Sequence, residues 1–470
     1  QASDIVTLDP AGQQDTTSGV LMKHAYSTLL DVDNEGKVVP DLAESYEMKS
    51  DTEYVFKLRE DACFWDGTPV TAQDVKFSLD RAKGMPKTKS NTSKIEEVTV
   101  NGDHEVTIKL TEPYAAFKTI VTQHNLSILS EKAVTEAGDS YGDVDNLLGS
   151  GPFKVTEWVP NDHYTLVRND NYWGEMPIAT SITCRVIPEG SARTIALEAG
   201  EIDVVWSVDP TDCANVESNP DVKLLSQPST GIDYVGMNTQ KEKFSDKRVR
   251  QAINYALDKQ AFVDTIIEGR GLVANSYINA AIPGWTDEVE AYPYDPEKAK
   301  ELLAEAGYPD GFECSIFVNG DLRTRSAQIL QAQLADVGIK VDISTYEWGA
   351  LLDTLNAGEH EMFLLGWSNT SFDPDGSTYQ LFYSGNHGAT GNRAFFSNDK
   401  VDELILSAQR ESEESKRMEL YKELQFVLHE ESPWCPLYYK ENNVGVRADL
   451  KGFTLHAGAQ HYLGNCHYEE

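Results

Sequence analysis

The chain has 470 residues, too many for one compact hydrophobic core and enough for two or three domains. Hydrophobic residues make up 40% and aromatic residues 10% of it, a globular composition that argues against an intrinsically disordered protein. The formal net charge of -36 argues against a nucleic-acid partner, because so acidic a surface repels phosphate backbones; the acids are spread along the chain, which favours solvation over binding of one specific cation.

The beginning of the chain and its cysteines bear on where the protein works. The first residues, Gln1-Ala2-Ser3-Asp4, contain neither an initiator Met nor a signal peptide, so we expect a mature chain whose export segment has been removed. No apolar run approaches the roughly 18 residues that a membrane span needs. The cysteines form no C-x-x-C pair, so they predict neither a zinc site nor a redox motif, and the sequence leaves their disulfide pairing open. They are Cys63, Cys184, Cys213, Cys314, Cys435 and Cys466.

The first third of the chain alternates short strands with capped helices. Residues 54–59 and 106–110 alternate apolar and polar side chains, which predicts half-buried antiparallel strands. Between them, Thr71-Ala-Gln-Asp74 has the spacing of a capping box. It predicts a helix whose Val75 and Leu79 share one face.

Two further helices carry clear signals at their ends. Asp246 is placed to cap a helix whose apolar residues, including Val249 and Ile253, recur at helical spacing. Asp295 precedes a proline and begins a second helix, which we expect to end at Gly307.

The second half of the chain predicts an α/β arrangement. An apolar strand at 314–318, a helix at 327–337 and a strand at 339–346 follow one another and suggest a βαβ unit. The segment 411–427 is predicted to be a helix, and its many charges indicate a solvated outer face.

Ser140 lies in a G-x-S-x-G pattern, which in hydrolases carries the nucleophile between a buried strand and a helix. Polar residues surround it here, so a chance match in a loop is favoured over an esterase. No Walker loop, dinucleotide fingerprint or His-paired nucleophile accompanies it. We therefore expect a protein that is not an enzyme and needs no cofactor.

Two patterns resemble metal sites without completing them. Residues 31–36 begin like a calcium loop, but Leu42 stands where a bidentate Glu is needed, so an acidic turn is favoured. His456, His461, Cys466 and His467 cluster near the C-terminus without the spacing of a helical metal motif. We expect no metal site at either place.

Five groups of segments stand in one order along the chain. They are residues 42–46 with 54–59, 64–69 and 71–81; residues 149–153 with 167–173; residues 246–256; residues 346–349; and residues 432–438. Read together, they resemble the family 5 extracellular solute-binding proteins, which include dipeptide, oligopeptide, glutathione and nickel binders. The resemblance covers nearly the whole chain.

This resemblance implies an α/β fold of two lobes, the type II-like periplasmic-binding-protein architecture of cluster C, with an extra subdomain inserted in the first lobe and a two-strand hinge. We expect the core of the first lobe at 1–30, 152–231 and 439–470, the inserted subdomain at 31–151, and the second lobe at 232–438. The hinge strands are expected near 234–238 and 437–440.

The implied function is that of an exported receptor, periplasmic or a cell-surface lipoprotein, that serves an ABC importer. As a monomer it would capture a short peptide by hinge closure and deliver it to the transmembrane permease subunits, anchored to the membrane through a missing lipid-modified N-terminal segment. An alternative is the same role for a non-peptide or N-blocked ligand, such as a glutathione-like thiol peptide, a metal chelate or a glycoside. A sensor that signals to a membrane receptor is a further alternative.

The resemblance also marks two tryptophans. Trp348 and Trp367 stand nineteen residues apart, the spacing of two pocket tryptophans in the peptide binders. Both are expected to line the ligand site, and a place in the core is the alternative for each. Peptide binders commonly carry an Asp three residues after the second tryptophan, where it pairs with the ligand's α-ammonium. Thr370 occupies that position here.

The segment around Thr370 therefore bears on the class of ligand. Residues Ser368, Asn369, Thr370 and Ser371 resemble the glutathione-binding branch, where this segment is rich in Ser and Thr. Asp373 and Asp375 lie just beyond and are candidates for the ammonium, with an acidic turn as the alternative. The substitution matters because a buried ammonium without a counter-charge is costly.

Three arginines are candidates for a carboxylate of the ligand. Arg323 and Arg325 follow the strand at 314–318, where the dipeptide binders carry an Arg, although exposure to solvent is an alternative for each. Arg393 is a third candidate, as a bidentate clamp.

Overall fold

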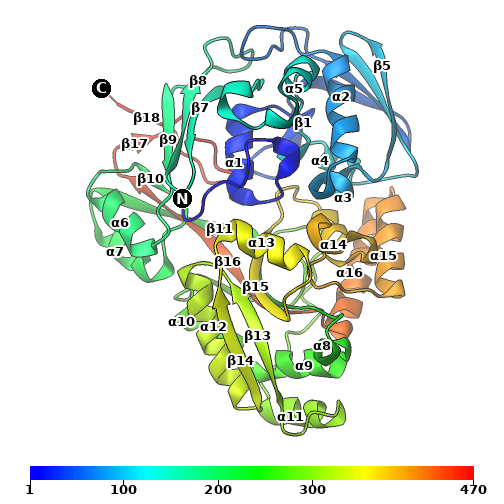
Figure 1. Ribbon diagram of the computed structural model, residues 1–470, viewed down its shortest axis with the longest axis vertical. Helices are drawn as coiled ribbons and strands as arrows, with labels where there is room; N and C mark the ends of the chain where they lie inside the picture. Colours follow the sequence, from blue (N-terminus) through cyan, green and yellow to red (C-terminus); the bar gives the residue numbers. More distant parts are fainter. Residues whose placement is uncertain (470) are drawn as a thin grey trace.

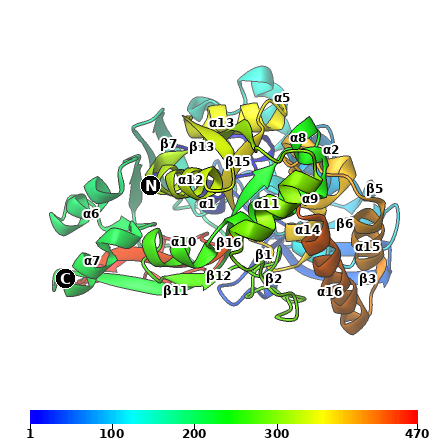
Figure 2. The same cartoon turned by 90° about the horizontal axis from the view of Figure 1, so that it is seen from below.

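The computed structural model describes residues 1–469 and shows two halves joined by two long antiparallel strands (Figure 1). These strands are β11, Val222–Met237, and β16, Trp434–Arg447. They pair along most of their length in a seven-stranded sheet of order β10-β16-β11-β15-β13-β14, with β12 beside β16. The view from below shows α6 and α7 at one end of the molecule and α15 and α16 at the other (Figure 2).

We call residues 1–221 with 448–469 the first half. It contains a four-stranded sheet of order β3-β4-β6-β5 and a three-stranded sheet β7-β8-β9. Its strands are β1 Leu30–Val32, β2 Val38–Pro40, β3 Ala43–Ser50, β4 Glu53–Leu58, β5 Ile95–Gly102, β6 Glu105–Leu110, β7 Phe153–Val159, β8 His163–Arg168, β9 Ser181–Arg185, β10 Val204–Val205, β17 Leu450–Lys451 and β18 His467–Tyr468. Its helices are α1 Thr16–Ala25, α2 Ala72–Lys83, α3 Lys89–Thr92, α4 Phe117–Ile120, α5 Glu131–Ala137, α6 Gly190–Glu198 and α7 Cys213–Ser218.

We call residues 238–433 the second half. Its strands are β12 Gly271–Val273, β13 Phe312–Val318, β14 Ile339–Thr345 and β15 Met362–Ser368. Its helices are α8 Glu242–Ser245, α9 Lys247–Ala256, α10 Lys259–Thr265, α11 Pro296–Glu305, α12 Gly320–Ala335, α13 Trp348–Asn356, α14 Asp375–Phe382, α15 Asp399–Arg410 and α16 Glu414–Glu431.

The predicted caps and the βαβ unit are confirmed. The Asp74 carboxylate accepts hydrogen bonds from the Thr71 backbone N–H and hydroxyl, so the capping box forms. Asp246 and Asp295 accept from backbone N–H groups at the beginnings of α9 and α11. Strands β13 and β14 pair in parallel on either side of α12 in the chain. Helix α12 begins at Gly320, seven residues earlier than predicted, because polar residues in its first two turns hide the apolar period.

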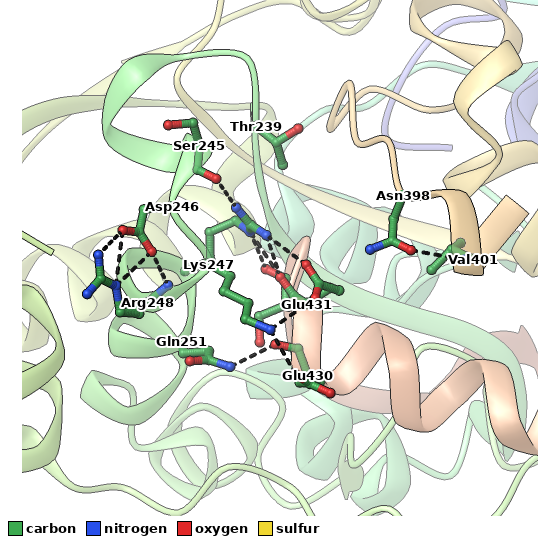
Figure 3. A network of polar contacts seen from close by, with 12 residues as sticks. Thr239, Ser245, Asp246, Lys247, Arg248, Gln251, Asn398, Val401, Glu430 and Glu431 are labelled. Atoms are coloured by element: carbon green, nitrogen blue, oxygen red, sulfur yellow. Dashed lines mark hydrogen bonds and ion pairs between the residues drawn. The ribbon is translucent and has the colours of Figure 1, made fainter.

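Helix α16 is only partly the solvated helix that its charges predict. It buries Tyr421, Leu424 and Leu428 along one face, and Arg417 is buried on the same face. Its C-terminal end is tied to α9 by a polar network (Figure 3). There Lys247 pairs with Glu430 at 2.8 Å and with Glu431 at 3.1 Å. Arg250 of α9 also donates to the carbonyl of Ser432 at 3.2 Å, which joins two of the segments on which the family resemblance rests.

The hydrolase-like and calcium-loop-like sequence patterns lie in a turn and in a hairpin. Ser140 lies in a short 3-10 turn, where its hydroxyl donates to the carbonyl of Ala137, and helix α5 rather than a strand stands directly before this turn. Residues 31–36 form part of the β1–β2 hairpin. All six cysteines are free. Among residues 1–469, no group of three His, Cys, Asp or Glu side chains is placed to hold a metal ion, and no helix has the length and apolar composition of a membrane span.

Candidate ligand-binding site

A cavity of about 370 Å³ lies where the two halves meet. Its size falls in the range of small-molecule sites, about 300 to 1,000 Å³. The first half contributes mostly polar groups to its wall, among them Gln14, Asp15, Asn91, Gln123, His124 and Gln460. The second half and the connecting strands contribute Tyr234, Arg323, Trp348, Trp367, Ser368, Thr370, Gln380, Arg393 and Lys440. A ligand here would touch both halves at once.

Three aromatic side chains form one part of the wall. Tyr234 of β11 is buried and stacks on Trp434, with ring centroids 3.4 Å apart and planes 7° from parallel. Trp367 at the end of β15 donates its indole N–H to the carbonyl of Gly376 at 3.1 Å. Trp348 begins α13, and its buried indole N–H has no acceptor among residues 1–469. The wall therefore combines fixed apolar surface with one unused donor.

Cationic side chains form another part of the wall. Arg323 of α12 and Lys440 of β16 lie beside the buried Asp233, at 3.8 and 2.9 Å respectively. Arg393 lies in the loop between α14 and α15 and is 7% exposed. Arg325 is not in the lining: it pairs with Asp209 of the first half at 2.6 Å. The two neighbouring arginines of α12 thus have different surroundings.

Asn369, Asp373 and Asp375 lie close in sequence to the cavity and outside its lining. The Asn369 amide donates to the Asp373 carbonyl at 2.7 Å and to the Ser377 hydroxyl at 2.8 Å. These bonds turn the chain after β15 toward α14 and carry both carboxylates away from the cavity. The structure does not place either carboxylate where a ligand in the cavity would meet it.

The two carboxylates have protein partners instead. Asp373 forms a bidentate pair with Arg417 of α16, at 2.9 and 2.5 Å. Asp375 accepts hydrogen bonds from the Tyr114 hydroxyl of the first half at 2.6 Å and from Gln409 at 2.9 Å. Burial raises the pKa of Asp375 to about 6, with the neighbouring Asp373 as the second cause.

Hydrogen bonds across the cavity join the halves directly. The Thr370 hydroxyl donates to Gln123 at 2.9 Å, and the Gln380 amide donates to Asn91 at 2.6 Å. Thr370 therefore lines the cavity, but its hydroxyl proton is already donated to Gln123 of the first half. Its neighbour Ser368 lies at the end of β15, opposite Gly231 of β11.

The sequence profile described as bacterial extracellular solute-binding proteins, family 5 Middle, matches residues 37–389, well over half of the chain. The chain belongs to this family. It is 32% identical to the glutathione-binding protein GsiB of Escherichia coli O1:K1 / APEC over 472 aligned residues, covering 96% of this chain and 90% of that protein. It is 30% identical to the dipeptide-binding protein of Escherichia coli (strain K12), covering 92% and 86%.

Solved structures of family 5 binding proteins have the same fold. The ABC transporter-associated periplasmic binding protein DppA from Helicobacter pylori, in complex with the peptide STSA, superposes with a TM-score of 0.95 and 29% identity, covering 100% of this chain and 97% of that one. AgaA of A. tumefacien R10, in complex with agropinic acid, gives a TM-score of 0.93 and 27% identity, covering 100% and 98%. The chain is a solute-binding protein with the type II periplasmic-binding-protein fold.

The sequence did not predict any of the first-half residues that line the cavity. Gln14 and Asp15 precede α1, and Gln123 lies before a short turn more than a hundred residues later. The one local signal was Asp15 as a helix cap: its carboxylate accepts from the Ser18 N–H at 2.9 Å, which fixes it at the cavity wall. Single polar residues in loops form no sequence pattern, so the sequence alone does not predict that they line a binding cavity.

Proposed function

We propose that this protein captures a small solute between its two halves and delivers it to the permease of an ABC importer, with a short peptide as the expected ligand. The observation that carries the proposal is the cavity lined by both halves, which are joined by β11 and β16. A ligand that contacts both halves binds the closed form better than an open one. That difference, about 5 kcal/mol for an almost complete shift, is what closes such a receptor.

The lobes proposed for this movement are residues 1–30, 152–231 and 439–470 for the first and 232–438 for the second, with 31–151 as an inserted subdomain. A separate hydrophobic core between positions 29 and 128 supports the inserted subdomain. A second core combines positions 5–26 and 153–184 with Trp65, Leu129, Val134 and Tyr141, so these four residues of 31–151 pack against the first lobe. Strands β11 and β16 shift register between Pro228 and Ile232, at the passage from one half to the other. We propose the hinge there and at residues 234–238 and 437–440.

A ligand without a free N-terminus is the second candidate, and one observation favours it. No carboxylate stands at the position of Thr370, and Asp373 and Asp375 are engaged with Arg417, Tyr114 and Gln409. Asp15 and Glu441 are the acids in the cavity wall. A free-amine peptide would therefore need one of these two carboxylates for its ammonium, whereas an N-blocked ligand would not.

We further propose that the protein is exported and works at the outer face of the inner membrane or at the cell surface, held there by a lipid on its N-terminal segment. The family description and the periplasmic neighbour from Helicobacter pylori support export. The proposal includes no cofactor, no metal ion of the site's own and no catalytic step.

We expect a bound solute to raise the melting temperature by a few degrees. A ligand at 100 times its dissociation constant adds about 2.7 kcal/mol of stability. The panel contains di- and tripeptides, N-acetylated peptides, glutathione, and nickel with histidine. In Trp367→Ala the ligand-induced shift should shrink, because affinity falls at least about tenfold, or about 1.4 kcal/mol.

Trp285→Ala is the matched control, since Trp285 also donates its indole N–H to a protein acceptor, Asn275 at 3.0 Å, away from the cavity. It should keep the full ligand-induced shift. Shifts with free peptides alone support the peptide receptor, and shifts with capped, thiol or metal ligands alone support the second candidate. An equal ligand-induced shift in Trp367→Ala and the unmodified protein would remove Trp367 from the binding site.

A further inference from the structure

Arg393 is a buried cation for which the protein supplies no counter-charge in contact. Its Nε donates to the Asn356 side chain at 3.0 Å, and its backbone carbonyl accepts a hydrogen bond from His360 Nε2 at 2.8 Å. These two bonds hold the residue in place. Among residues 1–469, no carboxylate oxygen lies within 4.0 Å of its guanidinium nitrogens. The side chain is 7% exposed and faces the cavity.

Burial of an unpaired charge is unfavourable, and an arginine cannot escape the penalty by losing its proton. Burial lowers the pKa of Arg393 from its ordinary value, but the guanidinium stays charged at any physiological pH. Its planar group offers parallel N–H donors of the geometry that a carboxylate accepts. An anionic group on the ligand would supply the missing partner.

Arg323 and Lys440 form a second cationic place, that is, a second position where an anionic group could bind, on the same cavity wall. Arg323 and Lys440 share one buried carboxylate, Asp233, which leaves two cations against one acid. The Arg323 Nε has no hydrogen-bond acceptor among residues 1–469. The Tyr234 phenol is within electrostatic reach of both places, since Arg393 and Arg323 each oppose the rise that burial causes in its pKa. The two places therefore belong to one continuous wall.

The acids around the cavity do not cancel these charges locally. Asp15 lines the cavity and lies within electrostatic reach of Arg393, but one of its oxygens caps α1 and it forms no ion pair with the guanidinium. Burial raises the pKa of Asp15. Glu441 also lines the cavity and lies within electrostatic reach of Arg270, which pairs with Glu217 at 2.8 Å. Neither Asp15 nor Glu441 forms an ion pair with Arg393.

We propose that the ligand is a small acid with two anionic groups, one bound by Arg393 and the other by Arg323 with Lys440. This inference rests on the proposed function and narrows it to a class of solute. An acidic dipeptide, an N-acylated acidic amino acid and a dicarboxylate conjugate share this chemistry. A peptide of neutral side chains has only its terminal carboxylate and would leave one cationic place empty.

Capture from a mixture tests the inference. The full chain is dialysed to equilibrium against a protein hydrolysate supplemented with yeast extract, and the retained compounds are identified by mass spectrometry. We expect retained compounds with at least two acidic groups. Affinity for the retained compound should fall at least tenfold in Arg393→Gln, fall less in Arg393→Lys, and stay unchanged in Arg248→Gln, an exposed arginine of α9.

A ligand-side measurement keeps the test valid if Arg393→Gln unfolds. Conversion of either acid of the retained compound to its amide should weaken binding at least tenfold. Retained compounds with one acidic group or none, or amides that bind as well as the acid, overturn the inference and leave the receptor function standing. A protein that retains no compound at all contradicts the proposed function itself.

Discussion

The free energy of unfolding should fall by several kcal/mol as the pH is lowered from 6.5 to 4. Five histidines are buried, and burial lowers the pKa of each to about 4, or to about 3 for one of them. They are His24, His124, His360, His456 and His461, of which His456 has the lowest pKa. In the unfolded chain a histidine titrates near 6.5. Between these values only the unfolded chain binds the protons, so stability falls with decreasing pH.

Buried acids act in the opposite sense and offset part of this loss. Burial raises the pKa of Asp41 to about 7 and that of Asp375 to about 6, and it also raises the pKa of Asp15. These groups bind protons in the folded chain where the unfolded chain does not, so they favour folding as the pH is lowered from 7 to 4. Each pKa unit of difference is worth about 1.4 kcal/mol. Because the histidines outnumber the acids, we expect a net loss on the order of 5 kcal/mol.

Urea denaturation at pH 7 and at pH 5, followed by far-UV circular dichroism, measures this loss as a lower midpoint at pH 5. His461→Gln should reduce the pH dependence, because one buried titrating group is removed. His163→Gln is the control: Glu157 and Asp162 raise the pKa of this surface histidine, so its removal should not reduce the pH dependence. A midpoint that stays the same or rises at pH 5 would contradict the expected net loss of stability.

Asp373→Asn should lower the free energy of unfolding by about 3 to 5 kcal/mol, because it leaves a buried cation without its partner. The Asp373 and Arg417 side chains are only 11% and 9% exposed. The exchange removes the charge but not the volume, so packing is retained. The expected effect is therefore on the whole fold, whereas a residue that only binds an ammonium would affect only ligands with a free amine.

The midpoint of urea denaturation checks this expectation, with Asp139→Asn as an exposed control that changes stability by less than about 0.5 kcal/mol. The double variant Asp373→Asn with Arg417→Met should be more stable than Asp373→Asn alone, since the unpaired charge is gone. A single variant as stable as the control would mean that the pair contributes nothing, and selective loss of free-amine ligands would return Asp373 to the binding site.

The sequence predicted most of the fold, because caps, strand periods and family segments are local. The family resemblance pointed to Trp348, Trp367 and Arg323, and these line the cavity together with the further candidate Arg393. Their part in binding stays a prediction. The order of the segments also predicted the two-lobed architecture. These features depend on residues near one another in the chain or on motifs whose spacing is fixed.

What the sequence could not predict depends on contacts between distant elements. Asp373 and Asp375 follow Trp367 closely, and no local pattern shows that the chain turns them away from the cavity. The partner of Asp373 stands 44 residues further along, and Tyr114 lies 261 residues before Asp375. Only the packing of α14 against α16 and against the first half decides where these carboxylates point.

Closure of the two halves on a solute is tested most directly by small-angle X-ray scattering. The radius of gyration is measured without solute and with a saturating amount of the compound that gives the largest melting shift. We expect it to decrease on binding, because contacts to both halves favour the closed form. A radius that stays constant while the site is saturated would contradict capture by hinge closure.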